Sequence, residues 1–120
     1  MKTVFIVDDD LTNLKIGKNA LSNSYYVYAL DSGAEMLKLT ENVVPDLILL
    51  DINMPGMDGY ETLKKIRNTG RIADVPVIFL TARDQRGEIM QGLSHGPDDY
   101  ITKPFLPDHL IERVRAHLAG

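Results

Sequence analysis

The sequence predicts a doubly wound α/β domain in which a five-stranded parallel sheet has helices on both faces. Three observations carry this prediction. Short apolar segments alternate with segments of helical periodicity, and the links between them are short. Residues 47–50 are apolar without alternation, as in a strand that is covered on both faces. Five strands that alternate with five helices favour parallel pairing through right-handed crossovers.

The expected strands are short apolar segments that end in polar residues. They cover residues 3–7, 25–30, 46–51, 75–80 and 98–102. The first is β-branched and aromatic, which favours a buried strand. Pro76 lies near the start of the fourth, where a missing N–H donor is tolerated.

Capping patterns mark the starts of the expected helices. Ser32 with Glu35 and Asp58 with Glu61 match the capping box, in which both side chains satisfy backbone N–H groups. These two helices are expected to end near residues 42 and 70. Asp10 is expected to cap the first helix.

Apolar spacing predicts which helix faces point inward. The expected inward residues are Leu14, Gly17 and Leu21 in the first helix, Tyr60, Leu63 and Ile66 in the third, and Leu110, Ile111, Val114 and Leu118 in the last. The last helix opens with Pro107, whose missing N–H suits a first turn, but Leu106 before it offers no polar cap.

Residues 85–95 form the weakest of the expected helices. Gly87 and Gly92 each cost about 1 kcal/mol relative to alanine in a helix interior, and large apolar residues are few. Its local stability should therefore be low, and we expect this segment to be loosely held.

Length and composition limit the classes of protein to which the chain can belong. The chain has 120 residues, of which 44% are hydrophobic and 25% charged, so we expect residues 1–120 to form a single globular domain. The formal charge of −4 argues against direct nucleic-acid binding. No apolar run approaches the ~20 residues of a membrane span, and no cysteine is present for thiol chemistry. We expect a cytoplasmic protein without a membrane partner.

Polar residues with compatible chemistry stand where the expected strands end. They are Asp8, Asp9 and Asp10 after the first strand, Asp51 at the third, Thr81 at the fourth and Lys103 at the fifth. Ligands of open parallel sheets bind at this edge. Each residue alone has an ordinary explanation as a cap, a turn hydroxyl or a surface charge. Four strand ends together favour a shared site.

If the first and third strands are neighbours, their carboxylates converge. Two such charges ~4 Å apart repel by about 4 kcal/mol at an effective dielectric of 20, so the cluster indicates a cation or shared protons. An all-oxygen, carboxylate-rich site suits Mg²⁺. With the Lys103 ammonium and the Thr81 hydroxyl, such a site is typical of phosphoryl transfer to a carboxylate nucleophile.

The whole chain resembles the receiver domains of bacterial two-component response regulators. The matching motifs are residues 7–10 (VDDD), 50–59 (LDINMPGMDG), 80–82 (LTA) and 98–105 (DDYITKPF). The resemblance implies a flavodoxin-like (βα)5 three-layer sandwich with strand order 2-1-3-4-5, the order known for a chemotaxis member of this family. It also implies a cis Lys103–Pro104 bond.

The resemblance implies roles for the site residues. Asp51 would accept a phosphoryl group from a sensor histidine kinase or a histidine phosphotransfer protein. Mg²⁺, or Mn²⁺ in its place, would be held by Asp9, Asp51 and the backbone carbonyl of Asn53, and would reach Asp8 through water. Thr81 and Lys103 would bind the phosphoryl oxygens.

The signal would travel through an aromatic side chain. The resemblance implies that the rotamer of Tyr100 follows Thr81 and reports to the surface formed by the fourth helix, fifth strand and fifth helix; a purely structural core role for Tyr100 is about as well supported. Asn53 and Arg83 would tune the phosphoryl lifetime, and their effects could oppose each other. Residues 94–97 (SHGP) depart from the family pattern.

Other functions fit less well. A phosphatase of the haloacid dehalogenase type needs a second Asp where Asn53 stands, and a flavin binder needs a phosphate loop where residues 8–10 are acidic. A degenerate receiver that acts by protein binding alone remains an alternative, although no key position is missing. An output domain beyond Gly120, a separate protein target and a homodimer through the fourth-helix to fifth-helix face are all open.

Overall fold

The structure is a computed structural model, which describes residues 1–82 and 96–119. Within these ranges it forms one sheet of five parallel strands in the order β2-β1-β3-β4-β5, so the expected strand order is confirmed. The strands are β1 (Thr3–Val7), β2 (Tyr26–Leu30), β3 (Leu47–Asp51), β4 (Val77–Ala82) and β5 (Asp99–Lys103). The helix expected over residues 85–95 lies outside the described ranges.

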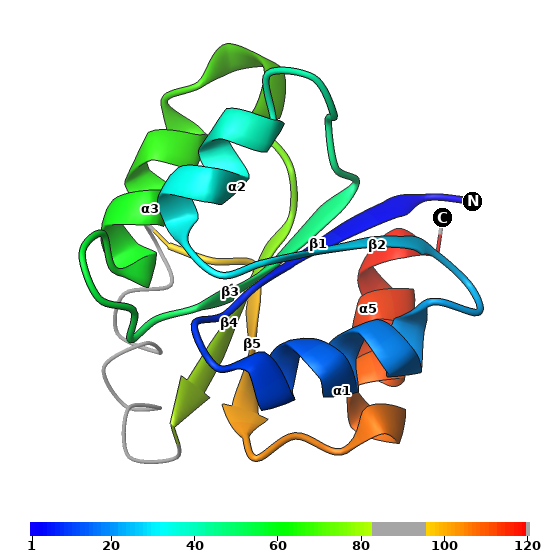
Figure 1. Cartoon of the computed structure of the whole chain (residues 1–120). Coiled ribbons are helices and arrows are strands. Elements are labelled where there is room, and N and C mark those ends of the chain that lie inside the picture. The colour runs from blue at the N-terminus through cyan, green and yellow to red at the C-terminus, as the bar shows by residue number, and fades with distance from the viewer. Residues whose placement is uncertain (83–95, 120) are drawn as a thin grey trace.

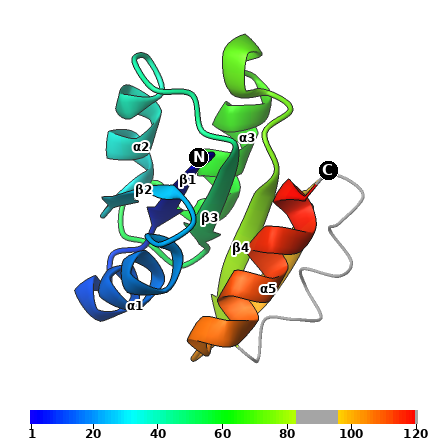
Figure 2. The same ribbon diagram turned by 90° about the vertical axis from the view of Figure 1, so that its right-hand side faces the viewer.

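Helices cover both faces of this sheet. They are α1 (Leu11–Leu21), α2 (Gly33–Leu39), α3 (Gly59–Arg67), the short 3₁₀ helix η1 (Gly70–Ile72) and α5 (Pro107–Leu118). Helices α1 and α5 lie together on one face, and α2 and α3 lie on the other (Figures 1 and 2). Each face has its own apolar core, because successive residues of β1 and β3 point to opposite sides. The three-layer architecture is therefore confirmed.

Several element boundaries differ from those expected. Helix α2 ends at Leu39 and α3 at Arg67, each about three residues earlier than predicted. Strand β4 begins at Val77 and continues through Ala82, because Thr81 and Ala82 still pair with β5. The pairing between β4 and β5 therefore extends β4 to Ala82 and β5 to Lys103, although these residues were expected to follow the strands.

The Asp10 cap and the Ser32 and Asp58 halves of the two predicted capping boxes are present. Asp10 accepts a hydrogen bond from the N–H of Thr12, Ser32 from that of Glu35, and Asp58 from that of Glu61. Helix α5 starts with Pro107 and has no side-chain cap at Leu106, as predicted. Local capping patterns are therefore reliable guides to the helix starts in this chain.

The prediction that Tyr60 points inward was wrong. Tyr60 is 45% exposed, and its ring makes a T-shaped contact with the ring of Phe79 at a centroid distance of 5.4 Å. The inward position belongs to its neighbour Gly59, where an added Cβ would lie 2.6 Å from the backbone carbonyl oxygen of Asp51. The buried face of α3 therefore begins at Gly59 and continues through Thr62, Leu63 and Ile66.

Two expected inward residues of α5 are only half-buried. Leu110 and Val114 are fully buried, whereas Ile111 and Leu118 pack at the margin of the core. No helix in the described ranges is long and apolar enough to cross a membrane.

Candidate functional site

The site lies at the carboxyl edge of the sheet, and the register of the strands places its residues there. Asp51 is the last residue of β3 and pairs with Leu80 of β4. Thr81 pairs with Thr102, and Ala82 pairs with Lys103, the last residue of β5. Asp8 follows directly after β1, which pairs with β3. Four strands therefore bring their ends to one place.

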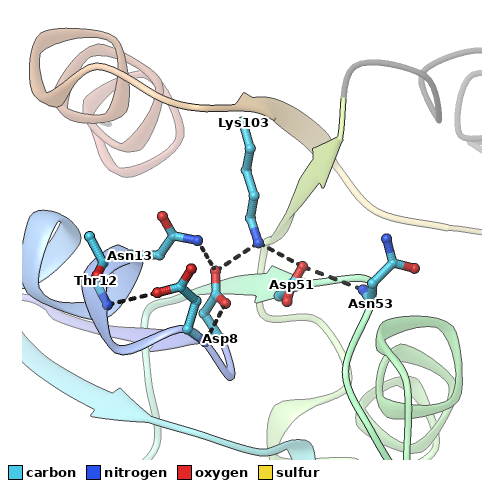
Figure 3. A network of polar contacts seen from close by, with 7 residues as sticks. Asp8, Thr12, Asn13, Asp51, Asn53 and Lys103 are labelled. Carbon is cyan, nitrogen blue, oxygen red and sulfur yellow. Dashed lines mark hydrogen bonds and ion pairs between the residues drawn. The ribbon is translucent and has the colours of Figure 1, made fainter.

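Lys103 joins two carboxylates that come from different strands. Its Nζ lies 2.9 Å from Asp8 Oδ2 and 2.9 Å from Asp51 Oδ1. Figure 3 shows the lysine reaching down between the two acids. Asp8 is fully buried, and Asp51 is 4% exposed. The ammonium group is thus the counter-charge that the described residues supply to this pair.

Burial and charge shift the pKa values of these groups. Burial raises the pKa of the Asp51 carboxyl, and the nearby charge of Asp8 adds to this rise, although the hydrogen bond from Lys103 opposes it; the pKa of Asp51 is about 6. Burial alone would lower the pKa of the Lys103 ammonium, but its hydrogen bonds to Asp8 and Asp51 outweigh burial and raise that pKa. Lys103 is therefore charged at neutral pH, and Asp51 is ionised but easily protonated.

Asp9 completes an acidic cluster with Asp8 and Asp51. One carboxylate oxygen from each lies within 4.8 Å of the others, and Asp9 is exposed to solvent. Two oxygens on opposite sides of an octahedral Mg²⁺ are about 4.2 Å apart, since each bond is about 2.1 Å long. The oxygen-only donor set therefore fits a hard divalent cation that keeps part of its water shell, and oxygens within 4.8 Å of one another need to close in by at most about 0.6 Å to reach this separation.

The remaining predicted residues have different environments. Thr81 is buried, and its hydroxyl donates to the carbonyl oxygen of Ala82 at 3.1 Å. Asn53 is exposed, and its backbone N–H lies 3.4 Å from Asp51 Oδ1. Tyr100 is half-buried against the core on the α2–α3 face. Arg83 lies outside the described ranges, so its predicted effect on lifetime stays a prediction.

The structure also reveals one residue that the sequence did not single out. Asn13, in the first turns of α1, donates from Nδ2 to Asp8 Oδ2 at 3.2 Å. The one feature that could have predicted this contact is the position of Asn13 in the helix that follows Asp8, next to the buried Leu14. The Lys103–Pro104 peptide bond is cis, as the resemblance implied.

The fold and the site define a class of α/β protein in which strand ends gather acids and one lysine at the carboxyl edge of the sheet. The chain belongs to the family of response regulator receiver domains, which matches residues 4–115. Receiver domains of this family are signalling modules, and the site is consistent with phosphorylation-dependent two-component signalling.

Relatives and solved structures agree with this assignment. The chain is 41% identical over 116 residues to response regulator MprA of Mycobacterium sp. (strain KMS), a match that covers 96% of this chain and 50% of the relative. Chemotaxis protein CheY4 of Vibrio cholerae matches with a TM-score of 0.91 at 28% identity, covering 98% of this chain and 99% of that one. The BeF3-activated DrrB receiver domain matches with a TM-score of 0.88 at 31% identity, covering 100% and 99%. The chain spans about half the length of the curated relatives it matches.

Proposed function

We propose that this chain is a phosphorylation-dependent switch in which Asp51 accepts a phosphoryl group. The donor is a phosphohistidine on a sensor histidine kinase or a histidine phosphotransfer protein. The observation that carries the proposal is the position of Asp51, a buried carboxylate held between the Lys103 ammonium and two further acids. A nucleophile beside an ammonium group and two acids that could bind a cation suits a reaction whose catalysis is positioning and charge neutralisation.

The transfer balances without a further reactant. A carboxylate oxygen of Asp51 forms the new P–O bond while the P–N bond to the donor imidazole breaks, and the imidazole nitrogen keeps the bonding electrons and takes up a proton. Asp51 must be ionised to attack, and its pKa of about 6 leaves it mostly ionised at neutral pH. Lys103 and the Thr81 hydroxyl bind the phosphoryl oxygens in this proposal.

Mg²⁺, or Mn²⁺ in its place, fits the acidic cluster. Asp9, Asp51 and the backbone carbonyl of Asn53 would hold it, and Asp8 would reach it through water. When bound, the ion neutralises charge on the phosphoryl oxygens and orients them. The exposed Asp9 leaves one side of the cluster open to solvent, which suits a cation that keeps several waters.

The readout and the partners are part of the same proposal. Tyr100 would follow Thr81 and alter the surface formed by the fourth helix, β5 and α5, while Asn53 and Arg83 would set how long the phosphoryl group lasts. The target would be an output domain beyond Gly120 or a separate protein, and a homodimer through this surface would fit the same scheme. We propose one receiver domain over residues 1–120, acting in the cytoplasm without nucleic acid or membrane contact of its own.

Intact-mass measurement after incubation with acetyl phosphate tests the proposal. The wild type should gain one phosphoryl group only when Mg²⁺ is present, and Asp51→Asn should gain none. Asp31→Asn, which removes an exposed acid outside the cluster, is the matched control and should behave as the wild type. No gain under any condition would favour the degenerate receiver that acts by binding alone.

A further inference from the structure

The Asn13 side chain, on α1, donates a hydrogen bond to Asp8 of the acidic cluster. It is half-buried on α1, and its Nδ2 lies 3.2 Å from Asp8 Oδ2. In Figure 3 its amide points at Asp8 from the side opposite Asp51. An ionised carboxylate accepts hydrogen bonds and donates none. The amide nitrogen of Asn13, which is a donor, is therefore the group that suits this contact.

Asp8 needs such donors because it is a fully buried acid. Its Oδ1 accepts from the backbone N–H of Asp10 at 2.9 Å, and its Oδ2 accepts from Asn13 and lies beside the Lys103 ammonium. A buried carboxylate without donors costs several kcal/mol. Three donors from three segments therefore fix the orientation of this one side chain.

Only two of these donors stay with Asp8 through the proposed reaction cycle. Lys103 is shared with Asp51, and in the proposed function it turns to the phosphoryl oxygens. The Asp10 N–H is part of the backbone, and Asn13 is anchored on a helix. When the lysine moves, Asn13 is the remaining side-chain donor to Asp8 among the described residues.

The chemistry of an amide suits this task. A neutral donor restricts the carboxylate to one orientation, yet it leaves the negative charge intact. A lysine or arginine at the same place would cancel the charge that a divalent cation needs. Outer-shell hydrogen bonds of this kind commonly set metal affinity.

We propose that Asn13 is a positioning residue, which holds Asp8 in the orientation that divalent-cation binding requires. The proposal rests on the proposed function of the acidic cluster as a cation site. It assigns no contact between Asn13 and the ion or the phosphoryl group, since its effect is transmitted through Asp8.

Calorimetric titration of the unphosphorylated chain with Mg²⁺ tests the proposal. Asn13→Leu keeps the branched shape of the side chain and suits a helix, but it removes the donor, and it should raise the Kd for Mg²⁺ roughly tenfold. Asn13→Ala should act in the same way, so the test survives if one variant folds poorly. Asn13→Gln keeps a donor and should recover part of the affinity. Asn19→Leu, an exposed position on the same helix, is the control and should leave the Kd unchanged.

A second readout separates positioning from a general structural effect. In phosphorylation by acetyl phosphate, Asn13→Leu should raise the half-saturating Mg²⁺ concentration by roughly the same tenfold factor. The maximal rate at saturating Mg²⁺ should stay within about twofold of the wild type, because Asn13 touches no reacting atom.

Several results would overturn the inference. They are an unchanged Kd in both Asn13→Leu and Asn13→Ala, an equal loss in Asn19→Leu, or a lower maximal rate without any change in half-saturation. The absence of Mg²⁺ binding by the wild type would also overturn it. If the wild type binds Mg²⁺ and Asp51 takes no phosphoryl group, the proposed function fails and the role of Asn13 in cation binding still stands.

Discussion

The Lys103 ammonium lies 2.9 Å from Asp51 Oδ1, across the gap between β5 and β3. The two strands are not neighbours, because β4 lies between them. The long lysine side chain therefore crosses a strand to neutralise the acid that we propose as the phosphoacceptor. The same ammonium also serves Asp8, so any event that draws it away from Asp51 changes the charge balance of the whole cluster.

Replacement of Asp51 by Asn is expected to stabilise the fold at about pH 7. The pKa of Asp51 is about 6 in the folded chain and 3.8 in its reference state, so the folded state holds the proton more tightly. The free energy of unfolding of the wild type should then fall as pH rises from about 4 to about 6. Asp51→Asn lacks this titration and should be more stable than the wild type by about 1–3 kcal/mol at about pH 7. The difference between the two pKa values sets the upper limit of this range.

Urea denaturation of both proteins at about pH 4.5 and about pH 7 measures this effect. The advantage of Asp51→Asn should grow with pH. An advantage that is equal at both pH values, or a variant that is less stable at about pH 7, would show that the ionised Asp51 is not strained in the fold. Asp31→Asn serves as the control for loss of an exposed acid.

Binding of Mg²⁺ is expected to release protons near pH 6. A nearby cation favours the ionised carboxylate and therefore lowers the pKa of Asp51, which without the ion is about 6. Calorimetry in buffers with different ionisation enthalpies counts the protons released. We expect a fraction of a proton at about pH 6 and almost none at about pH 8. Proton release that does not depend on pH in this range would contradict the assignment of Asp51 to the Mg²⁺ site.

Replacement of Lys103 by Met should destabilise the metal-free chain and make it more dependent on Mg²⁺. The change leaves Asp8 and Asp51 as buried acids without their shared cation. We expect a loss of about 2–3 kcal/mol, less than for a fully buried pair, because the lysine side chain is 21% exposed. Thermal unfolding with and without Mg²⁺ tests this, and the ion should raise the Tm of the variant more than that of the wild type. An equal rise in both would argue that Lys103 does not offset the charge of the cluster.

The sequence predicted the layers of the fold because its signals are local. Alternating segments identified the strands and helices, and the caps at Asp10, Ser32 and Asp58 depend on residues two or three positions away. The strand order followed from the family resemblance, since no local pattern specifies which strands are neighbours. The roles of the site residues stay predictions, although the structure does bring Asp8, Asp51 and Lys103 together.

The features that the sequence did not predict depend on tertiary contact. The rotation of α3, which leaves Tyr60 outside, is set by the close approach of Gly59 to the end of β3. The contact of Asn13 with Asp8 is equally hidden, because an Asn on an amphipathic helix resembles any exposed polar residue. Both depend on how closely a helix approaches a strand end, which apolar spacing does not report.

The close approach of Gly59 leads to a prediction about stability and the site together. In Gly59→Ala the added Cβ would lie 2.6 Å from backbone atoms of Asp51 and Ile52, which cannot shift without moving β3. We expect a loss of about 2–3 kcal/mol and slower phosphorylation. Gly70→Ala is the matched control, since nothing lies within 4 Å of its Cβ position, and it should change stability by less than about 1 kcal/mol. Equal effects of the two variants in urea denaturation would contradict this explanation.

Borohydride reduction of the phosphorylated chain, followed by peptide mapping, tests the central proposal most directly. Hydride converts an aspartyl phosphate to homoserine and so marks the acceptor residue itself. We predict homoserine at Asp51 and at no other acid, with conversion that requires Mg²⁺ during phosphorylation. Homoserine at Asp8 or Asp9, or a phosphorylated chain in which Asp51 stays intact, would contradict the account.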